Sequence, residues 1–179
     1  MEYLEIVDEN NNFTWEILER NFVHENWLFH REIAVLLVNE KWEILLQKRA
    51  WTKKQEPNKW ALCAGHIDIW EKELDATIRE IGEEIWIKFW ENEIEFLFTY
   101  KLEIDFWNNW FNNHFKYFYF VKTDKKIEDF RIDLDEVSEL KYISFQEFEK
   151  KLRNRDEEIA FSNLPFVWRM LEELKNKIN

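Results

Sequence analysis

The chain of 179 residues is poor in cysteine, proline and glycine, and it has no long apolar run. Its single cysteine, Cys63, excludes a disulfide within the chain, which favours a reducing compartment, so we expect a cytoplasmic protein. No apolar run approaches the roughly 18 residues of a membrane-spanning helix. The acidic first residues, MEYLEIVDEN, lack the apolar core of a signal peptide. We therefore predict no membrane partner.

A basic stripe is also missing, and the formal net charge is −12. This charge argues against duplex nucleic acid as a partner. An acidic protein that acts on an anionic substrate needs a cation between the two. With 46% apolar and 35% charged residues, the composition is that of a soluble globular protein. We predict one domain over residues 1–179, made of an N-terminal strand and polar segment (1–29), a core (about 30–155) and a C-terminal helix (163–178). Whether it forms a homodimer is left open.

The apolar pattern predicts a mixed sheet flanked by helices, an α/β (α+β) architecture. Residues 31–39 and 43–49 are apolar runs joined by NEKW, as in a hairpin. Further strands are expected at 2–7, 60–65, 93–104, 114–122 and 139–144, and helices near 145–152 and 164–178. The polar segment 13–30 has no clear period. Residues 72–85 predict a helix, because Leu74, Ile78, Ile81 and Ile85 recur at spacings of 4, 3 and 4.

This helix carries glutamates opposite its apolar stripe. At ~100° per residue, Glu80, Glu83 and Glu84 lie between roughly 180° and 280° from Leu74, and Glu73 joins them. Neighbouring like charges repel by a few tenths of a kcal/mol per pair. A divalent cation bound between the carboxylates would turn this repulsion into a net attraction, because carboxylate oxygens are the ligands that Mg²⁺ and Mn²⁺ prefer. A solvated acidic face is the alternative explanation.

The spacing around the helix resembles the Nudix box, G-x5-E-x7-R-E-U-x-E-E-x-G-U, where U is a bulky aliphatic residue. The chain matches eight of the nine defined positions, and Trp86 replaces the last glycine. The matching residues are Gly65, Glu71, Arg79, Glu80, Ile81, Glu83, Glu84 and Ile87. The resemblance implies a Nudix fold, a mixed sheet between helices in which the box forms a loop–helix–loop.

The same resemblance implies Mg²⁺- or Mn²⁺-dependent hydrolysis of a nucleoside diphosphate derivative or a related organic diphosphate. It places metal ligands at Glu80, Glu83 and Glu84, with the Gly65 carbonyl as a further ligand. One of the glutamates would help to deprotonate the attacking water, and Arg79 would orient the carboxylates. Metal ions suit this chemistry, because they neutralise phosphate oxygens and acidify bound water.

Tryptophan occupies positions that suit glycine. Trp86 follows the box helix, where a left-handed residue is expected, and Trp42 stands in the hairpin turn NEKWEI. About 7% glycine, roughly 12–13 residues, is usual, whereas the chain has 2 glycines and 11 tryptophans. We hypothesise that most of these tryptophans are UGA codons read as glycine in the cell. Trp42, Trp70, Trp86, Trp107 and Trp110 are predicted to be such codons, Trp60 and Trp168 are predicted to be genuine, and Trp15 and Trp51 are undecided.

The segment KRAWTKKQEPNKWALCAGH resembles the Nudix subgroup related to isopentenyl-diphosphate isomerase. That resemblance implies diphosphate binding by Arg49 and Lys53, and it matches His24, His30 and His66 to metal-binding histidines, although a surface or core role is the simpler reading of His24. Two departures argue against isomerisation. Cys63 is shifted by one position, so it should face away from the site, and Asn112, Asn113 and His114 stand where a glutamate pair is needed. We therefore predict a hydrolase, with an isomerase and a non-catalytic binding module as alternatives.

Overall fold

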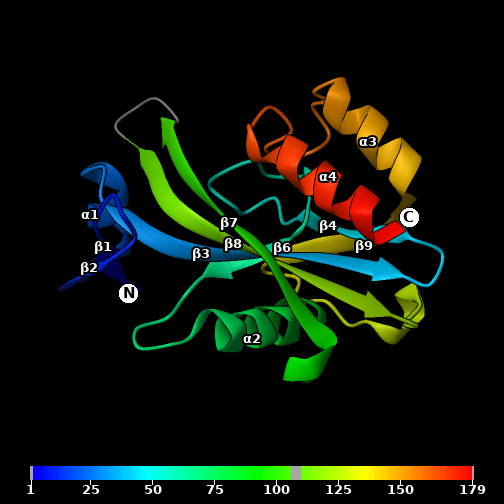
Figure 1. Cartoon of the computed structure of the whole chain (residues 1–179), viewed down its shortest axis with the longest axis horizontal. Coiled ribbons are helices and arrows are strands. Elements are labelled where there is room, and N and C mark those ends of the chain that lie inside the picture. The colour runs from blue at the N-terminus through cyan, green and yellow to red at the C-terminus, as the bar shows by residue number, and fades with distance from the viewer. Residues whose placement is uncertain (1, 106–109, 179) are drawn as a thin grey trace.

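The computed structural model describes residues 2–105 and 110–178, and these residues form a mixed sheet with helices on both faces (Figure 1). The described strands make up one nine-stranded sheet. They are β1 (Tyr3–Val7), β2 (Phe13–Glu19), β3 (Phe29–Asn39), β4 (Glu43–Arg49), β5 (Trp60–Ala61), β6 (Cys63–His66), β7 (Ile94–Asp105), β8 (Phe111–Thr123) and β9 (Val137–Ser144). The α-helices are α1 (Arg20–Glu25), α2 (Glu73–Ile85), α3 (Phe145–Arg153) and α4 (Phe166–Ile178), and short 3-10 turns lie at Glu91–Glu93 and Ile127–Asp129.

Strand β3 lies at the centre of the sheet. It pairs antiparallel with β1, β4 and β6, and parallel with β8. Its side chains alternate between the two faces, as in any strand. Ala34, Leu36 and Val38 pack in the core under α3 and α4, whereas Ile33, Val35 and Leu37 pack in the core over α2. Figure 1 shows α2 on one face of the sheet and α3 with α4 on the other. The predicted mixed sheet between helices is therefore confirmed.

The box helix begins one residue later than predicted, at Glu73, and ends at Ile85 as expected. Its predicted apolar stripe faces the sheet: Ile81 and Ile85 are fully buried, and Leu74 and Ile78 pack against them partly buried. The strands expected at 93–104, 114–122 and 139–144 are present as β7, β8 and β9. Among the described residues, no helix is long and apolar enough to cross a membrane.

The segment 13–30 differs from the sequence-based expectation, because it contains a strand and a helix. Strand β2 is at the edge of the sheet, bonded only to β1 among the described strands. None of its seven residues is buried, so it has no reason to alternate between apolar and polar side chains. Helix α1 has six residues, too few for a helical period to appear. Neither element could be read from hydrophobic periodicity.

Five of the ten tryptophans in the described segments adopt a left-handed backbone, with φ between 54° and 68°. They are Trp15, Trp27, Trp42, Trp70 and Trp86. Trp110 is not among them, and Trp107 lies outside the described residues. A residue with a Cβ costs ~1–2 kcal/mol in this conformation. Five such sites together approach the 5–15 kcal/mol that typically stabilise a folded domain.

Replacing Trp70 and Trp86 together by glycine is expected to raise the melting temperature. Both side chains are largely exposed, at 69% and 64%, so their removal loses little packing. Relief of two left-handed sites should gain about 2 kcal/mol, or roughly 4–8 °C for a chain of this size. Trp51→Gly is the matched control, because Trp51 is 77% exposed but does not have a positive φ. Thermal unfolding of the three proteins measures the shift; an unchanged or lower value for the double variant would show that these turns carry no strain.

Candidate active site

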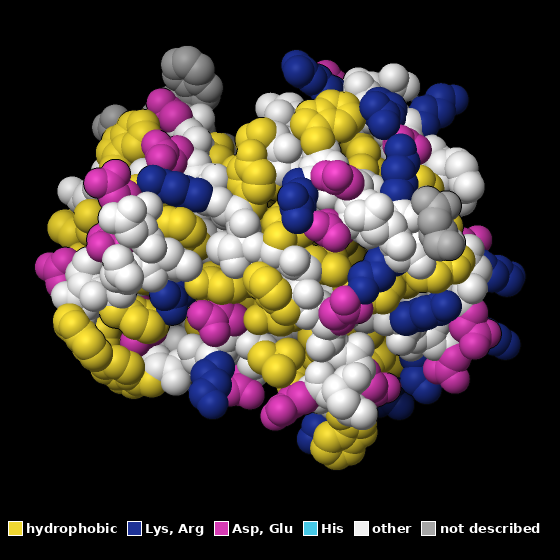
Figure 2. Space-filling model, in the orientation of Figure 1, with side chains coloured by type: hydrophobic (Ala, Val, Ile, Leu, Met, Phe, Trp, Pro, Cys, Tyr) yellow, Lys and Arg dark blue, Asp and Glu magenta, His cyan; other side chains and the backbone are white. Residues whose placement is uncertain are grey.

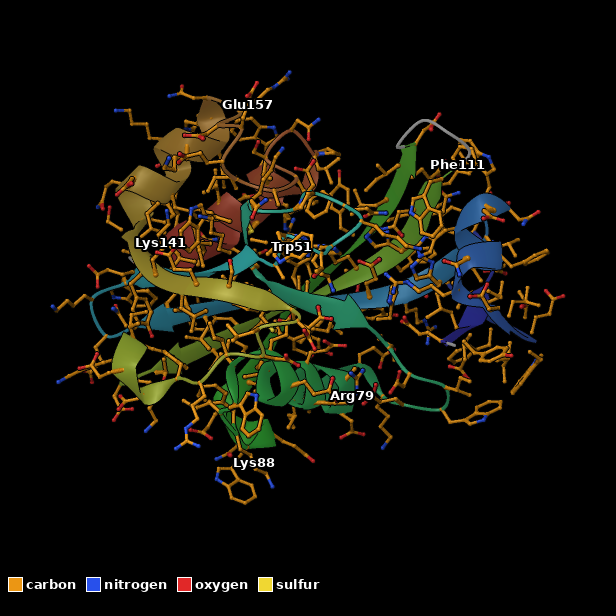
Figure 3. All side chains as sticks on the ribbon, turned by 180° about the vertical axis from the view of Figure 1, so that it is seen from behind. Trp51, Arg79, Lys88, Phe111, Lys141 and Glu157 are labelled. Atoms are coloured by element: carbon orange, nitrogen blue, oxygen red, sulfur yellow. The ribbon has the colours of Figure 1, made fainter. Side chains whose placement is uncertain are left out.

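Arg79 connects the loop before α2 to the acids of the helix (Figure 3). Its Nε and Nη2 atoms donate to the two carboxylate oxygens of Glu71, at 2.9 and 2.8 Å. Its Nη1 donates to Glu80 at 2.8 Å and to Glu83 at 3.1 Å. Its Nη2 also donates to the carbonyl oxygen of His66, at 2.9 Å. These bonds raise the pKa of Arg79, the pair with Glu71 contributing most. One guanidinium therefore fixes four groups of the predicted box.

Gly65 lies directly against the carboxylate of Glu80. A Cβ atom built at Gly65 would overlap the Cδ and both carboxylate oxygens of Glu80. Any larger residue at this position would have to displace the Glu80 carboxylate, and this close approach, rather than a positive φ, is what favours glycine. Burial raises the pKa of Glu80, against the lowering effect of Arg79. The backbone of β6 at Gly65 and the Glu80 carboxylate therefore lie in contact.

Glu84 is buried, and it lies nearer the sheet than the helical projection suggested. Only 5% of its surface is exposed, and Gln47 of β4 donates a hydrogen bond of 2.9 Å to its Oε2. Burial raises the pKa of Glu84 to about 8, with a smaller contribution from the charge of Glu80. Cys63 faces the same carboxylate from the core, and burial raises the pKa of its thiol well above the usual value. The acidic face is therefore more than a solvated helix surface.

The three glutamates differ in their surroundings. Glu83 is largely exposed and Glu84 is buried, while Glu80 is intermediate and paired with Arg79. Within the described segments, these three do not bring one oxygen each within 4.8 Å of one another. Glu73, which the helical projection placed with them, instead pairs with Arg31 at 3.4 Å. Glu80, Glu83, Glu84 and the backbone carbonyl of Gly65 would offer a cation only oxygen atoms, which suits a hard divalent ion.

A cleft of about 490 Å³ opens over these acids. Arg49, Lys53 and Lys116 bring cationic side chains to its wall. Lys53 is paired with Glu136, and Arg49 donates to the carbonyl oxygen of Gln55 at 3.1 Å. Burial lowers the pKa of Arg49, against the nearby charge of Glu84. The structure therefore places both predicted diphosphate-binding residues in the cleft with the box acids, and it adds Lys116.

The lining of the cleft also includes part of a group of histidines around Glu32, in which His24, His30 and His114 are buried and His66 is partly buried. Ligand atoms of His24, His30 and His66 lie within 4.8 Å of one another, and so do those of His30, Glu32 and His114. The Glu32 carboxylate receives Lys116 at 2.9 Å and Asn112 at 3.0 Å. In the described part of the chain, His24 Nε2 and His30 Nδ1 have no hydrogen-bond partner. Burial lowers the pKa of His24 to about 4, so its imidazole is neutral and able to bind a metal.

Sequence reasoning missed Glu32 and Lys116. The signal that could have found them is the i, i+2 spacing within each strand. His30 and Glu32 share one face of β3, and His114 and Lys116 share one face of β8. The parallel register sets His30 beside His114, and Glu32 beside Lys116. Knowing that register required the sheet topology. Cys63 is not among the residues that line the cleft, although Ala64, Gly65 and His66 are; its thiol is buried in the core with α2, next to Glu84.

The cleft continues into a smaller apolar cavity of about 60 Å³ beneath α4. The two spaces share Arg49, Ala64, Lys116 and Phe161. Four of the six alanines of the chain line the smaller cavity: Ala34, Ala61, Ala64 and Ala160. Larger side chains at these positions would fill it. The site therefore combines a charged end, at the box acids, with a compact apolar end.

Known proteins share this fold and this sequence pattern. A family model described as the NUDIX domain matches residues 28–162. An isopentenyl-diphosphate Delta-isomerase from Pectobacterium atrosepticum is 27% identical over 179 residues, covering 96% of either chain. An uncharacterized Nudix hydrolase from Listeria innocua is 28% identical over 177 residues, 98% of this chain and 96% of that one. A crystal structure from Deinococcus radiodurans, 15% identical and covering 98% of both chains, has the same fold with a TM-score of 0.69. The chain therefore belongs to the Nudix family.

Proposed function

We propose that this protein is a Nudix hydrolase that cleaves a phosphoanhydride bond in an organic diphosphate, using Mg²⁺ or Mn²⁺. Glu80, Glu83 and Glu84 hold the metal together with the Gly65 carbonyl. The observation that carries the proposal is the Arg79 network, which gathers Glu71, Glu80 and Glu83 at one end of a cleft lined by cationic side chains. The intact acids argue against a non-catalytic binding module.

The bound metal would neutralise phosphate oxygens and lower the pKa of a coordinated water. The protein's own residues position the substrate. Arg49, at the end of β4, and Lys53, in the loop that follows, bind the diphosphate, and Lys116 adds a third cation from β8. Arg79 holds Glu80 and Glu83 in place, and one of the box glutamates takes the proton of the attacking water. This division of roles reconciles an anionic substrate with a protein whose net charge is −12.

The apolar cavity beneath α4 would accommodate a compact apolar group of the substrate. Among the residues that line it, only Arg49 and Lys116 have charged side chains. A nucleobase needs hydrogen-bonding partners for its ring atoms, and buried polar groups without partners are costly. A short alkyl or alkenyl diphosphate would bury its chain there and leave the diphosphate at the acids. Homodimer formation, a cytoplasmic location and the absence of a nucleic-acid partner remain predictions.

Glu83→Gln is expected to reduce turnover by orders of magnitude and to leave the fold intact. Its side chain is 60% exposed, so the loss of charge removes a metal ligand without disturbing the core. Phosphate release would be measured with Mg²⁺ across a panel of nucleotide and alkenyl diphosphates. Asp75→Asn is the matched control, because Asp75 is an exposed acid on the same helix that does not line the cleft. Wild-type turnover in Glu83→Gln would exclude Glu83 as a ligand.

An isomerase acting on isopentenyl diphosphate is the second candidate, and the buried group of His24, His30, His66 and Glu32 favours it. The placement of Cys63 argues against it, because this thiol is buried in the core below α2 and does not line the cleft. Asn112 and His114 replace the expected glutamate pair, although Glu32 brings one carboxylate to the same place.

The purified protein is therefore expected not to convert isopentenyl diphosphate to dimethylallyl diphosphate. The reaction would be followed by separating isopentenyl from dimethylallyl diphosphate after incubation with Mg²⁺ or Mn²⁺. Conversion by the wild-type protein that is lost in Cys63→Ala would overturn this expectation and assign the thiol a catalytic role. Release of phosphate without isomerisation is the result that the hydrolase proposal requires.

A further inference from the structure

The left-handed tryptophans lie at turns of the kinds that glycine usually occupies. Trp27 follows α1, and the next amide, of Leu28, donates to the carbonyl of Val23 at 3.3 Å, the longer bond of a Schellman motif. Trp86 ends α2, with φ 54° and ψ 36°, and its amide donates to the carbonyl of Gly82 at 3.1 Å. Both helices therefore end on a left-handed residue, where glycine is the usual choice.

The other three left-handed tryptophans occupy a hairpin, a loop and a bulge. Trp42 closes the turn between β3 and β4, where its amide donates to the carbonyl of Asn39 at 3.0 Å. Trp70 stands in the loop directly before Glu71. Trp15 lies where the register of β1 with β2 shifts, between the pairs formed by Ile17 and Phe13. Hairpin turns and bulges both use glycine for a positive φ.

The side chains at these sites do not explain the choice of tryptophan. The rings of Trp15, Trp70 and Trp86 are 80%, 69% and 64% exposed. Trp27 and Trp42 stack on neighbouring phenylalanines, yet both have the same positive φ. Trp60 differs from these five, because it lies in β5 and is only 8% exposed. The Nζ of Lys141 lies over its ring, 3.8 Å from the ring centroid. The two glycines, Gly65 and Gly82, do not have a positive φ.

We infer that Trp15, Trp27, Trp42, Trp70 and Trp86 are glycines in the protein made by its own cell, encoded by UGA codons that this cell reads as glycine. The inference adds Trp15, which the sequence left undecided, and Trp27, and it keeps Trp60 as a true tryptophan, as the sequence predicted. It also brings the composition nearer to the ordinary, because five recoded positions raise the count from 2 glycines to 7, against the roughly 12–13 usual for a chain of this length. Two of the five sites, Trp70 and Trp86, bracket α2, so the loops on both sides of the box helix carry glycine in the cell.

Sequencing the gene and the native protein tests this inference. The gene should have TGA at the five positions and TGG at Trp60. Peptide mass spectrometry of the protein purified from its own cells should find glycine at positions 15, 27, 42, 70 and 86, and tryptophan at position 60. The Trp60 peptide is the internal control, because it shows that tryptophan survives the procedure. TGG codons at the five positions, or tryptophan in the native peptides, would overturn the inference.

Discussion

The ion pairs and hydrogen bonds of Arg79 are the interaction on which the site depends. Its guanidinium has five N–H donors, and five hydrogen bonds go to Glu71, Glu80, Glu83 and the carbonyl of His66. Without this cation, the carboxylates of the box would repel one another at short range. A lysine could not replace it, because only the planar guanidinium donates two parallel bonds to Glu71 while reaching the others. The loop and the helix of the box are therefore tied by one side chain.

The second constraint is the sheet, which brings a group of polar side chains to the same cleft as the acids. The parallel register of β3 and β8 brings His30, His114, Glu32 and Lys116 together. Buried charges are costly unless they are paired, and Glu32 is paired with Lys116 and contacts three histidines, His30, His66 and His114. The cationic side chains of the cleft are therefore a local concentration of positive charge in a protein that is acidic as a whole. On the face shown in Figure 2, basic side chains are scattered among acidic ones and form no continuous stripe.

The sequence predicted the parts of the site that are local in the chain. The 3.6-residue period gave α2 within one residue, and the box spacing gave Gly65, Glu71 and Arg79. It could not give Glu32 and Lys116, because their meeting depends on pairing between strands about 80 residues apart. The helical projection also did not predict the burial of Glu84, because the projection of a single helix contains no information on which of its side chains the neighbouring sheet covers. Strand β2 escaped notice because an exposed edge strand has no apolar alternation. Glycine-type turns, in contrast, were visible in the sequence at Trp42, Trp70 and Trp86, where the neighbouring residues set the turn.

The most direct test of this account is the affinity of the protein for Mn²⁺ in the variant Glu71→Gln. Glu71 is not a metal ligand in our proposal, and its role is to hold Arg79 and, through it, Glu80 and Glu83. Loss of such an outer partner typically weakens metal binding by roughly 10- to 100-fold. We predict a weakening of that order, measured by titration calorimetry, with circular dichroism and the melting temperature used to confirm that the variant folds. Wild-type affinity for Mn²⁺ in a folded Glu71→Gln protein would contradict the central role given to Arg79.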